Sequence, residues 1–282
     1  MAKPYVKWAG GKSQLAAELI GRFPDSFSRY IEPFCGSAAI FFLYMDRDGD
    51  IFSSDIPEAW LNDSNYYLMN CHKQISEQPE DVMRMLACFE VMYKQNPENV
   101  YRDIRKIVVE DDDEATMAAR FIFINKTCFN GLWRVNSKGK FNTPWNQTTS
   151  VNTFVHGNII RCSKLLQNTK MTTGHFRDVI KEAYEGDFLF VDPPYEPVSD
   201  SSSFTGYTPG GWTIDDTLEL SIALDEASDR GAKFIMTNSV SPVVYNSFSK
   251  FKITTVEAHR FVKAVSSDET REKVKETIIT NY

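Results

Sequence analysis

The stretch GDFLFVDPPYEP, residues 186–197, decides the fold class because it joins a buried strand to a rigid polar turn. Residues 188–191 are apolar without a break, which is typical of a strand covered on both faces of a parallel sheet. The run stops at the sequence DPPY, residues 192–195. Ligands of an open α/β sheet bind outside the carboxyl ends of its strands, so these four residues stand where chemistry is expected.

The DPPY sequence has an unusual supply of hydrogen-bond acceptors. Pro193 holds Asp192 in extended geometry, and neither Pro193 nor Pro194 carries an N–H. A carboxylate and backbone carbonyls therefore lie together without nearby donors, beside the aromatic ring of Tyr195. We take these four residues as catalytic candidates. A strand that ends in a stiff turn without function is the alternative.

A second strand, turn and helix pattern lies nearer the start of the chain. Residues 30–34 predict a strand, the small residues 35–39 a turn, and residues 40–45 an apolar helix. This order is the nucleotide-binding arrangement of doubly wound sheets, and it makes Phe34 and Gly36 candidate cofactor contacts. The turn is neither G-x-G-x-x-G nor a Walker loop, which disfavours nicotinamide and ATP as ligands.

Two further features fit a cofactor site, although an N-terminal loop with a helix cap and solvated surface acids are the alternatives. The sequence KWAGGK, residues 7–12, places two glycines before a helix, where a backbone can approach an anion closely. A carboxylate after the second strand of such a sheet can hold ribose hydroxyls. Asp55 and Asp63 both follow predicted strands, and spacing alone favours neither of them.

Composition limits the class of protein. With 282 residues and 42% hydrophobic side chains, the chain can form one large domain or a core with a second lobe. No apolar run approaches the roughly 20 residues that cross a bilayer, and residues 1–12 lack a secretory apolar segment. Five scattered cysteines and four separate histidines predict reduced thiols in a cytoplasm, without a metal site.

The charge of the chain is unevenly distributed. A net charge of −7 counts against a nucleic-acid partner, yet residues 115–177 contain no Asp or Glu. The basic residues of this acid-free segment are Arg120, Lys126, Arg134, Lys138, Lys140, Arg161, Lys164, Lys170 and Arg177. Within it, residues 129–146 interleave aromatic, amide and basic side chains with turn signals. Arg134, Asn136 and Lys138 are of the types that read base edges and hold phosphates, although a solvated hairpin is the alternative.

The rest of the chain alternates helices and strands around these motifs. Residues 65–126 show apolar stripes at helical spacing, and residues 171–176 and 233–238 predict further strands. Residues 199–211, rich in Ser, Gly and Thr, predict a mobile loop beside the site. The closing runs at 252–257 and 274–281 alternate as antiparallel edge strands do.

Four motifs in one order carry a resemblance to a known family. KWAGGK, EPFxGS, RVNxxGxFNTP and DPPY together resemble the Dam-type, D12 group of DNA adenine-N6 methyltransferases, and residues 265–276 are similar to the family's ending. The resemblance implies an α/β, Rossmann-like methyltransferase sheet with an inserted, mainly helical target-recognition lobe. It implies a catalytic domain at residues 1–70 and 165–282, and a DNA-recognition domain at residues 71–164.

The resemblance also assigns residues. Trp8 and Lys12 match positions that contact S-adenosylmethionine, and Lys7 and Arg134 match positions that touch DNA. Residues 61–66, LNDSNY, resemble the family's N-D-x-N segment, which favours Asp63 for the ribose and leaves Asp55 in reserve. Ala38 departs from the family, which usually has a second glycine at that position.

The implied reaction explains why DPPY is built as it is. The adenine N6 lone pair is delocalised, so the amine must be held in line with the methyl group of S-adenosylmethionine, which leaves as S-adenosylhomocysteine. Asp192 and the Pro193 carbonyl can each accept an N6–H bond, and Asp192 also borders the cofactor. The base must flip out of double-stranded DNA, and Tyr195 can stack on it.

Other functions remain open at this point. An acceptor-Pro-Pro-aromatic motif also suits cytosine N4 or a protein glutamine, although the carboxylate of Asp192 favours adenine. A catalytically dead DNA-binding regulator is the alternative from another class. The resemblance favours GATC or a related short site, in a bacterial, phage or restriction-modification setting. We expect a monomer or weak dimer that does not contact membranes.

Overall fold

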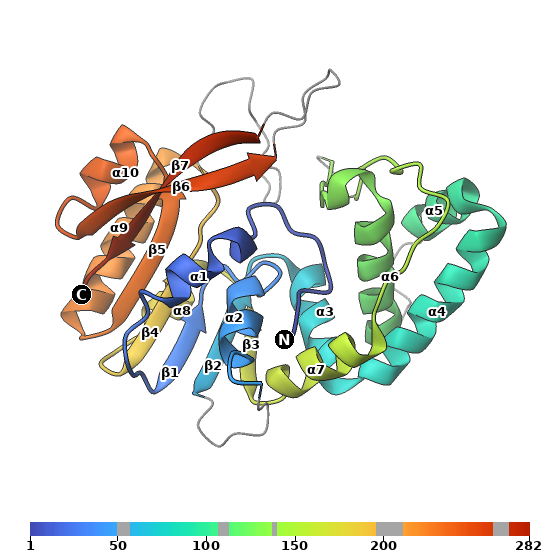
Figure 1. Cartoon of the computed structure of the whole chain (residues 1–282), viewed down its shortest axis with the longest axis horizontal. Helices are drawn as coiled ribbons and strands as arrows, with labels where there is room; N and C mark the ends of the chain where they lie inside the picture. Colours follow the sequence, from blue (N-terminus) through green and yellow to red (C-terminus); the bar gives the residue numbers. More distant parts are fainter. Residues whose placement is uncertain (50–56, 107–112, 137–139, 196–210, 262–270) are drawn as a thin grey trace.

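The computed structural model describes residues 1–49, 57–106, 113–136, 140–195, 211–261 and 271–282. Their strands form a seven-stranded sheet in the order β3-β2-β1-β4-β5-β7-β6 (Figure 1). The strands are β1 (Arg29–Glu32), β2 (Glu58–Asp63), β3 (Thr169–Thr173), β4 (Asp187–Val191), β5 (Lys233–Ser239), β6 (Lys252–Phe261) and β7 (Arg271–Thr280). Strands β1 to β5 pair in parallel, which confirms the predicted α/β sheet.

The expectation of two closing edge strands is wrong for the last of them. β7 lies inside the sheet, antiparallel to β5 on one side and to β6 on the other, and only β6 forms the edge. Ile278 and Ile279 are consecutive and both buried, on opposite faces of β7. An interior strand is buried on both faces, so two consecutive apolar residues indicate one. The alternating residues around this pair instead suggested an edge strand.

Helices cover both faces of the sheet. They are η1 (Lys12–Gln14), α1 (Ala16–Ile20), α2 (Ala39–Met45), α3 (Tyr66–Glu77), α4 (Pro79–Gln95), α5 (Pro97–Lys106), α6 (Glu114–Thr127), η3 (Phe129–Gly131), α7 (His156–Leu166), α8 (Phe176–Ile180), α9 (Ile214–Asp229) and α10 (Pro242–Ser247). Along β4, Phe188 packs with α1 and α2 in one core, and Leu189 packs with α8 and α9 in the other. This alternation is the signature of a doubly wound sheet.

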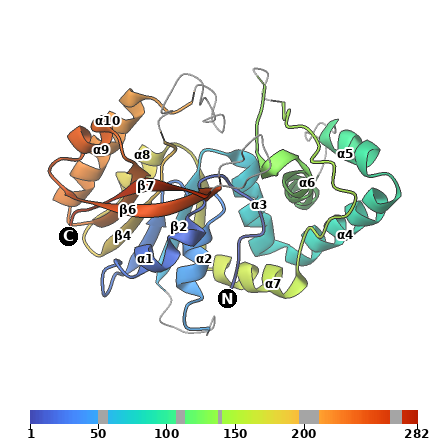
Figure 2. The ribbon, with the colours of Figure 1, turned by 45° about the horizontal axis from the view of Figure 1, so that its top comes forward.

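Helices α3 to α7 gather beside the sheet, around a buried α6 (Figures 1 and 2). The larger core continues from the sheet into this group, because Leu68 of α3 and Phe121 of α6 belong to the same cluster as Phe188. The predicted division between residues 71–164 and the rest therefore crosses a shared core. Within the described ranges, no helix has both the length and the apolar character needed to span a membrane.

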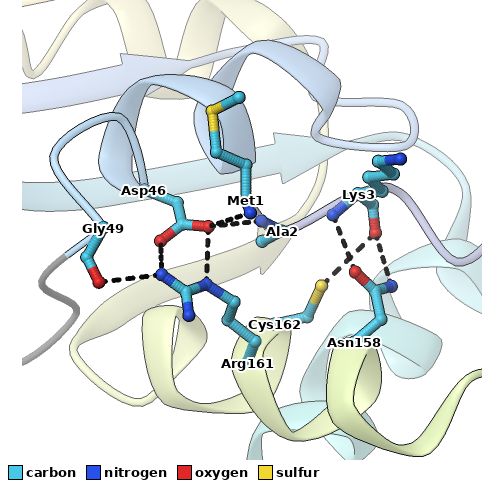
Figure 3. Close-up of polar contacts among 8 residues, drawn as sticks. All are labelled: Met1, Ala2, Lys3, Asp46, Gly49, Asn158, Arg161 and Cys162. Carbon is cyan, nitrogen blue, oxygen red and sulfur yellow. Dashed lines mark hydrogen bonds and ion pairs between the residues drawn. The ribbon is translucent and has the colours of Figure 1, made fainter.

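Residues 1–12, here called the strap, run between the sheet and the helical group (Figures 1 and 2). Figure 3 shows how its first residues are anchored to α7. The buried carboxylate of Asp46 accepts hydrogen bonds from the backbone N–H of Ala2 and from the guanidinium of Arg161. Asn158 pairs with both backbone groups of Lys3, at 2.9 and 2.8 Å. The first three residues of the strap are thus held in place, ahead of the KWAGGK motif at its other end.

We expect Asp46→Asn to lower the free energy of unfolding by about 2–3 kcal/mol, because it leaves the Arg161 guanidinium without its carboxylate. Burial alone would raise the pKa of Asp46, but the bonds from Arg161 and Ala2 outweigh it and lower that pKa. The wild-type advantage is therefore present above the unfolded-state pKa of about 4 and is lost as pH falls through the lower folded-state value. Urea unfolding at neutral and acid pH measures it, with exposed Asp48→Asn as the control. Equal stability of the two variants at neutral pH would contradict the expectation.

Candidate active site

The predicted site residues Asp63 and Asp192 lie at the carboxyl edge of the sheet, where the strand order reverses between β1 and β4. Glu32 ends β1, Asp63 ends β2, and Asp192 follows β4 directly. The parallel register of these strands brings residues that are far apart in sequence to one edge. This is the topological switch point at which open α/β sheets bind ligands.

Asp192 is held from two sides. Its Oδ1 atom lies 2.8 Å from the Lys12 Nζ atom and accepts a hydrogen bond of 2.7 Å from the Thr237 hydroxyl. The Lys12 ammonium also donates to the Gly10 carbonyl at 2.8 Å. The structure therefore places Lys12, predicted as a cofactor contact, in an ion pair with the catalytic carboxylate candidate.

Tyr195 is fixed by the same group of charges. Its hydroxyl donates to Glu276 Oε2 at 3.1 Å, and the Lys12 Nζ atom lies 4.8 Å from the centroid of its ring. Glu276 Oε2 and Lys12 Nζ are 4.0 Å apart. The ammonium of Lys12 thus lies among two carboxylates and an aromatic ring, a setting that favours its charged form.

Burial and these contacts shift the pKa values of Asp192, Lys12 and Glu32. Burial raises the pKa of Asp192, and the charge of Lys12 and the Thr237 hydroxyl oppose that rise. Burial alone would lower the pKa of Lys12, but the charge of Asp192 raises it above its ordinary value. Burial raises the pKa of neighbouring Glu32 to about 8, although the Tyr30 hydroxyl donates to it at 2.6 Å. Glu32 is therefore largely protonated at neutral pH, and Lys12 is charged.

The turn after β1 forms a close backbone cradle. Gly36 has φ of +49°, and a Cβ atom there would lie 2.7 Å from Cδ1 of Trp8. The carbonyl of Gly36 accepts a 2.8 Å bond from His72, whose other ring nitrogen meets the Tyr5 hydroxyl. Burial lowers the pKa of His72 to about 4, so its neutral ring donates through Nε2 and accepts through Nδ1. The turn thus packs against the Trp8 indole as closely as it does only because position 36 lacks a side chain.

Asp63 and Phe34 border this turn. Asp63 accepts hydrogen bonds from the backbone N–H groups of Gly36, at 3.1 Å, and Asn65, at 2.9 Å. A carboxylate has further lone pairs, so Asp63 can also accept hydroxyl donors. The ring centroid of Phe34 lies 5.1 Å from that of Phe176 and 5.6 Å from that of Trp212, in an aromatic wall. Asp55 lies outside the described residues.

The predicted recognition hairpin is present at residues 132–136 and 140–146. Val135 and Phe141 pair as an antiparallel bridge, and the Arg134 Nε atom donates to the Asn142 side chain at 2.7 Å. Arg134 and Asn136 are exposed, and the Asn136 side chain accepts a bond from the Lys140 backbone. Lys138 lies outside the described residues, as do the predicted loop at 199–210 and the sequence at 265–267.

The hairpin lies directly against the strap. The side chain of Asn125 in α6 bonds both backbone groups of Lys7, at 2.7 and 2.8 Å, and the carbonyl of Gly131 at 2.9 Å. A Cβ atom on Gly131, which has φ of +67°, would lie 2.7 Å from Cβ of Lys7. Burial and the charge of Lys7 lower the pKa of Lys126, which places this further cation near the same surface.

Other basic residues of the acid-free segment have structural partners instead. Arg120 is buried and donates to the carbonyls of Ile104 and Arg105 near the end of α5. Arg161 pairs with Asp46, and Arg177 pairs with carboxylates of α9. Several cations of residues 115–177 are therefore paired within the protein, which the charge of the segment alone did not indicate.

Sequence reasoning missed Thr237, Glu276 and Asn125. Glu276 lies on the same face of β7 as buried Ile278. A carboxylate at a strand position that faces the core could have indicated a functional residue. Thr237 follows the apolar run of β5, and Asn125 interrupts the apolar run of α6. A buried polar side chain requires a partner, but its identity lies in the tertiary structure.

Comparison with known proteins gives the same picture. The chain is 33% identical over 286 residues to the Type II methyltransferase M1.LlaDCHI of Lactococcus lactis subsp. cremoris, covering 99% of this chain and 95% of that relative. It is 31% identical to the Type II methyltransferase M.MjaIII of Methanocaldococcus jannaschii, covering 99% of each. It is 26% identical to a DNA adenine methylase of Vibrio cholerae, covering 92% of this chain and 90% of the relative.

The family model of the D12 class N6 adenine-specific DNA methyltransferases matches residues 8–262. This match includes residues 8–12 of the KWAGGK motif, the turn after β1, the hairpin and DPPY, and it confirms the resemblance on which the sequence expectations rest. The chain belongs to the D12 class of N6 adenine-specific DNA methyltransferases.

Proposed function

We propose that this enzyme methylates an adenine that has flipped out of duplex DNA, with Asp192, Pro193, Pro194 and Tyr195 forming the base site. The single observation that carries the proposal is the position of Asp192. Its carboxylate lies at the switch point of the sheet with one oxygen held by Lys12 and Thr237. An adenine inside a duplex cannot reach such a recessed group, so the base must leave the stack.

The chemistry assigns a task to each group. Asp192 and the carbonyl of Pro193 accept the two N6–H bonds, which localises the nitrogen lone pair and aligns it with the methyl group. The lone pair forms the new N–C bond, the C–S bonding electrons remain on sulfur, and one N6 proton is released. Tyr195 stacks on the base, a contact that stabilises it by roughly 1–3 kcal/mol.

The cofactor of this reaction is S-adenosylmethionine, which supplies an electrophilic methyl group on a sulfonium centre. The turn at Gly36 supports its placement there, because it follows β1 at the switch point of the sheet and presents backbone without a side chain beside Trp8. Asp63 would accept from ribose hydroxyls, and Phe34 would provide an aromatic wall for the adenine ring. Lys12 would act through Asp192, to which it is paired.

The hairpin at residues 132–146 would read the DNA sequence, with Lys7 and Lys126 beside it and residues 71–164 forming most of the recognition lobe. Arginine commonly reads guanine by two hydrogen bonds in the major groove. Asn142 holds Nε of Arg134 and so fixes the plane of its guanidinium. These features, with the family, support GATC or a related short site that contains guanine.

We expect Arg134→Ala to lose about 10- to 100-fold in discrimination between its site and single-base variants, because one base contact is worth about 1–3 kcal/mol. Methylation rates on a set of duplexes that differ at one base measure this. The matched control is Lys140→Ala on the same hairpin, an exposed cation expected to weaken binding equally across sequences and to reduce its salt dependence. Unchanged discrimination in Arg134→Ala would remove the arginine from base reading.

Sequencing of N6-methylated adenines in DNA from a host that expresses the enzyme identifies the site. Methylation confined to one short adenine site is the expected result. Methyl transfer to cytosine N4, or to protein and not DNA, would contradict the proposal. The names of the two Type II relatives support a role beside a restriction enzyme, for which resistance of the modified DNA to cleavage is the test.

A further inference from the structure

Two buried residues outside the four ordered motifs contact Asp192, Tyr195 and Lys12 from neighbouring strands. Thr237 in β5 is fully buried and donates its hydroxyl to Asp192 Oδ1 at 2.7 Å. Glu276 in β7 is buried, accepts from the Tyr195 hydroxyl at 3.1 Å and lies 4.0 Å from Lys12 Nζ. Burial of a hydroxyl and a carboxylate is costly, and apolar side chains would serve the sheet better. Their presence at the site edge therefore calls for a role in the site.

We propose that Thr237 and Glu276 are positioning residues for methyl transfer, Thr237 fixing the carboxylate of Asp192 and Glu276 fixing Tyr195 and Lys12. This inference rests on the roles proposed above for Asp192 and Tyr195. It adds two residues that lie beyond the DPPY sequence and act on the base only through it.

Thr237 determines which carboxylate oxygen is available to the amine. Among the described residues, Lys12 and Thr237 both bond to Oδ1 of Asp192. Two bonds to one oxygen fix the rotation of the carboxylate and direct Oδ2 to the amine proton. Loss of one of them leaves the carboxylate free to turn, and small misplacements of a reacting group cost large factors in rate.

Glu276 sets how strongly Lys12 acts on Asp192. Lys12 from η1 is close to both carboxylates. The negative charge of Glu276 therefore offsets part of the electrostatic effect of the Lys12 ammonium on Asp192. The other titratable groups that face Asp192 are Tyr195 and, from β1, Glu32. The charge of Glu276 raises the pKa of Asp192, whereas the Thr237 hydroxyl lowers it. The two residues therefore push the ionisation of Asp192 in opposite directions.

The test compares Thr237→Val, Thr237→Ser and Glu276→Gln by kcat, KM for DNA and cofactor dissociation constant across pH. Asp192 must be ionised to accept the amine, so the acid limb of the kcat profile follows its pKa. Thr237→Val should lose about 10-fold or more in kcat, keep its cofactor affinity and shift the acid limb upward. Thr237→Ser should restore kcat, and Glu276→Gln should shift the acid limb downward.

Matched controls separate positioning from general damage to the sheet. Thr280→Val removes the hydroxyl of a buried threonine in β7 that pairs with Ile235 of β5, away from Asp192. Glu257→Gln neutralises an exposed carboxylate on β6. Both should keep the wild-type profile. The inference would be overturned if the acid limbs of the kcat profiles of Thr237→Val and Glu276→Gln shifted in the same direction, or if neither shifted. If Thr237→Val does not fold, the direction of the Glu276→Gln shift decides alone. Wild-type turnover by Asp192→Ala would instead overturn the proposed function.

Discussion

Replacement of Asp192 by alanine is expected to reduce kcat on the order of 10³-fold, about 4 kcal/mol of transition-state stabilisation, with cofactor affinity retained. The variant removes the proposed acceptor of the N6 amine, while Gly36 and Asp63, the proposed cofactor contacts, remain intact. Single-turnover methylation of duplex DNA measures the chemical step, and calorimetric titration with S-adenosylmethionine measures binding.

Asp192→Asn and Asp178→Ala complete this experiment. Asp192→Asn preserves volume and one acceptor oxygen but removes the charge paired with Lys12, so an intermediate rate is expected. Asp178→Ala removes an exposed carboxylate on α8 and should have wild-type turnover. Wild-type turnover in Asp192→Ala, in a variant that unfolds normally in urea, would show that methyl transfer does not depend on this carboxylate.

The second large effect is expected at Gly36, where alanine should weaken S-adenosylmethionine binding at least tenfold, about 1.4 kcal/mol. A Cβ atom would lie 2.7 Å from Trp8, and φ of +49° strains any side chain. Trp8 must therefore move, and the proposed cofactor cradle must change shape. Calorimetric titration gives the affinity directly.

Gly49→Ala is the matched control for this glycine. Gly49 also has positive φ, of +74°, but a Cβ atom there would meet nothing within 4 Å. The control should lose about 1 kcal/mol of stability through backbone strain alone and keep its cofactor affinity. Equal cofactor affinity in both alanine variants would mean that the turn at Gly36 does not hold the cofactor.

The fold was largely predictable because its central strands are short apolar runs that end in recognisable turns. Residues 188–191 lie in β4 as predicted, and the strand predicted at residues 30–34 is present as β1, which ends two residues earlier, at Glu32. β7 was harder, because its position between β5 and β6 depends on pairing over long sequence distances. The positive charge of residues 115–177 did not predict which cations are available to a ligand. Arg120 and Arg161 are bonded to groups within the protein that no local sequence pattern reveals.

The site was predictable as a set of separate motifs but not as a network. The motifs gave Asp192 and Tyr195 their chemical types, and the ordered resemblance gave them roles. Neither could show that Lys12 lies against Asp192, or that Glu276 reaches Tyr195 across 81 positions. Such contacts are made by the tertiary fold, and they appear in the sequence only as polar residues in apolar surroundings.

The contact between Gly131 and Lys7 has a consequence for engineering. Exchange of the proposed recognition hairpin between relatives is a route to new DNA specificities, but here Gly131, directly before the hairpin, lies against the strap that also carries Lys12. Asn125 binds both partners at once. A graft that keeps asparagine at 125 and glycine at 131 retains these contacts, whereas we expect one that changes either to disturb the strap at Lys7. The unit of exchange is therefore the hairpin beyond residue 131.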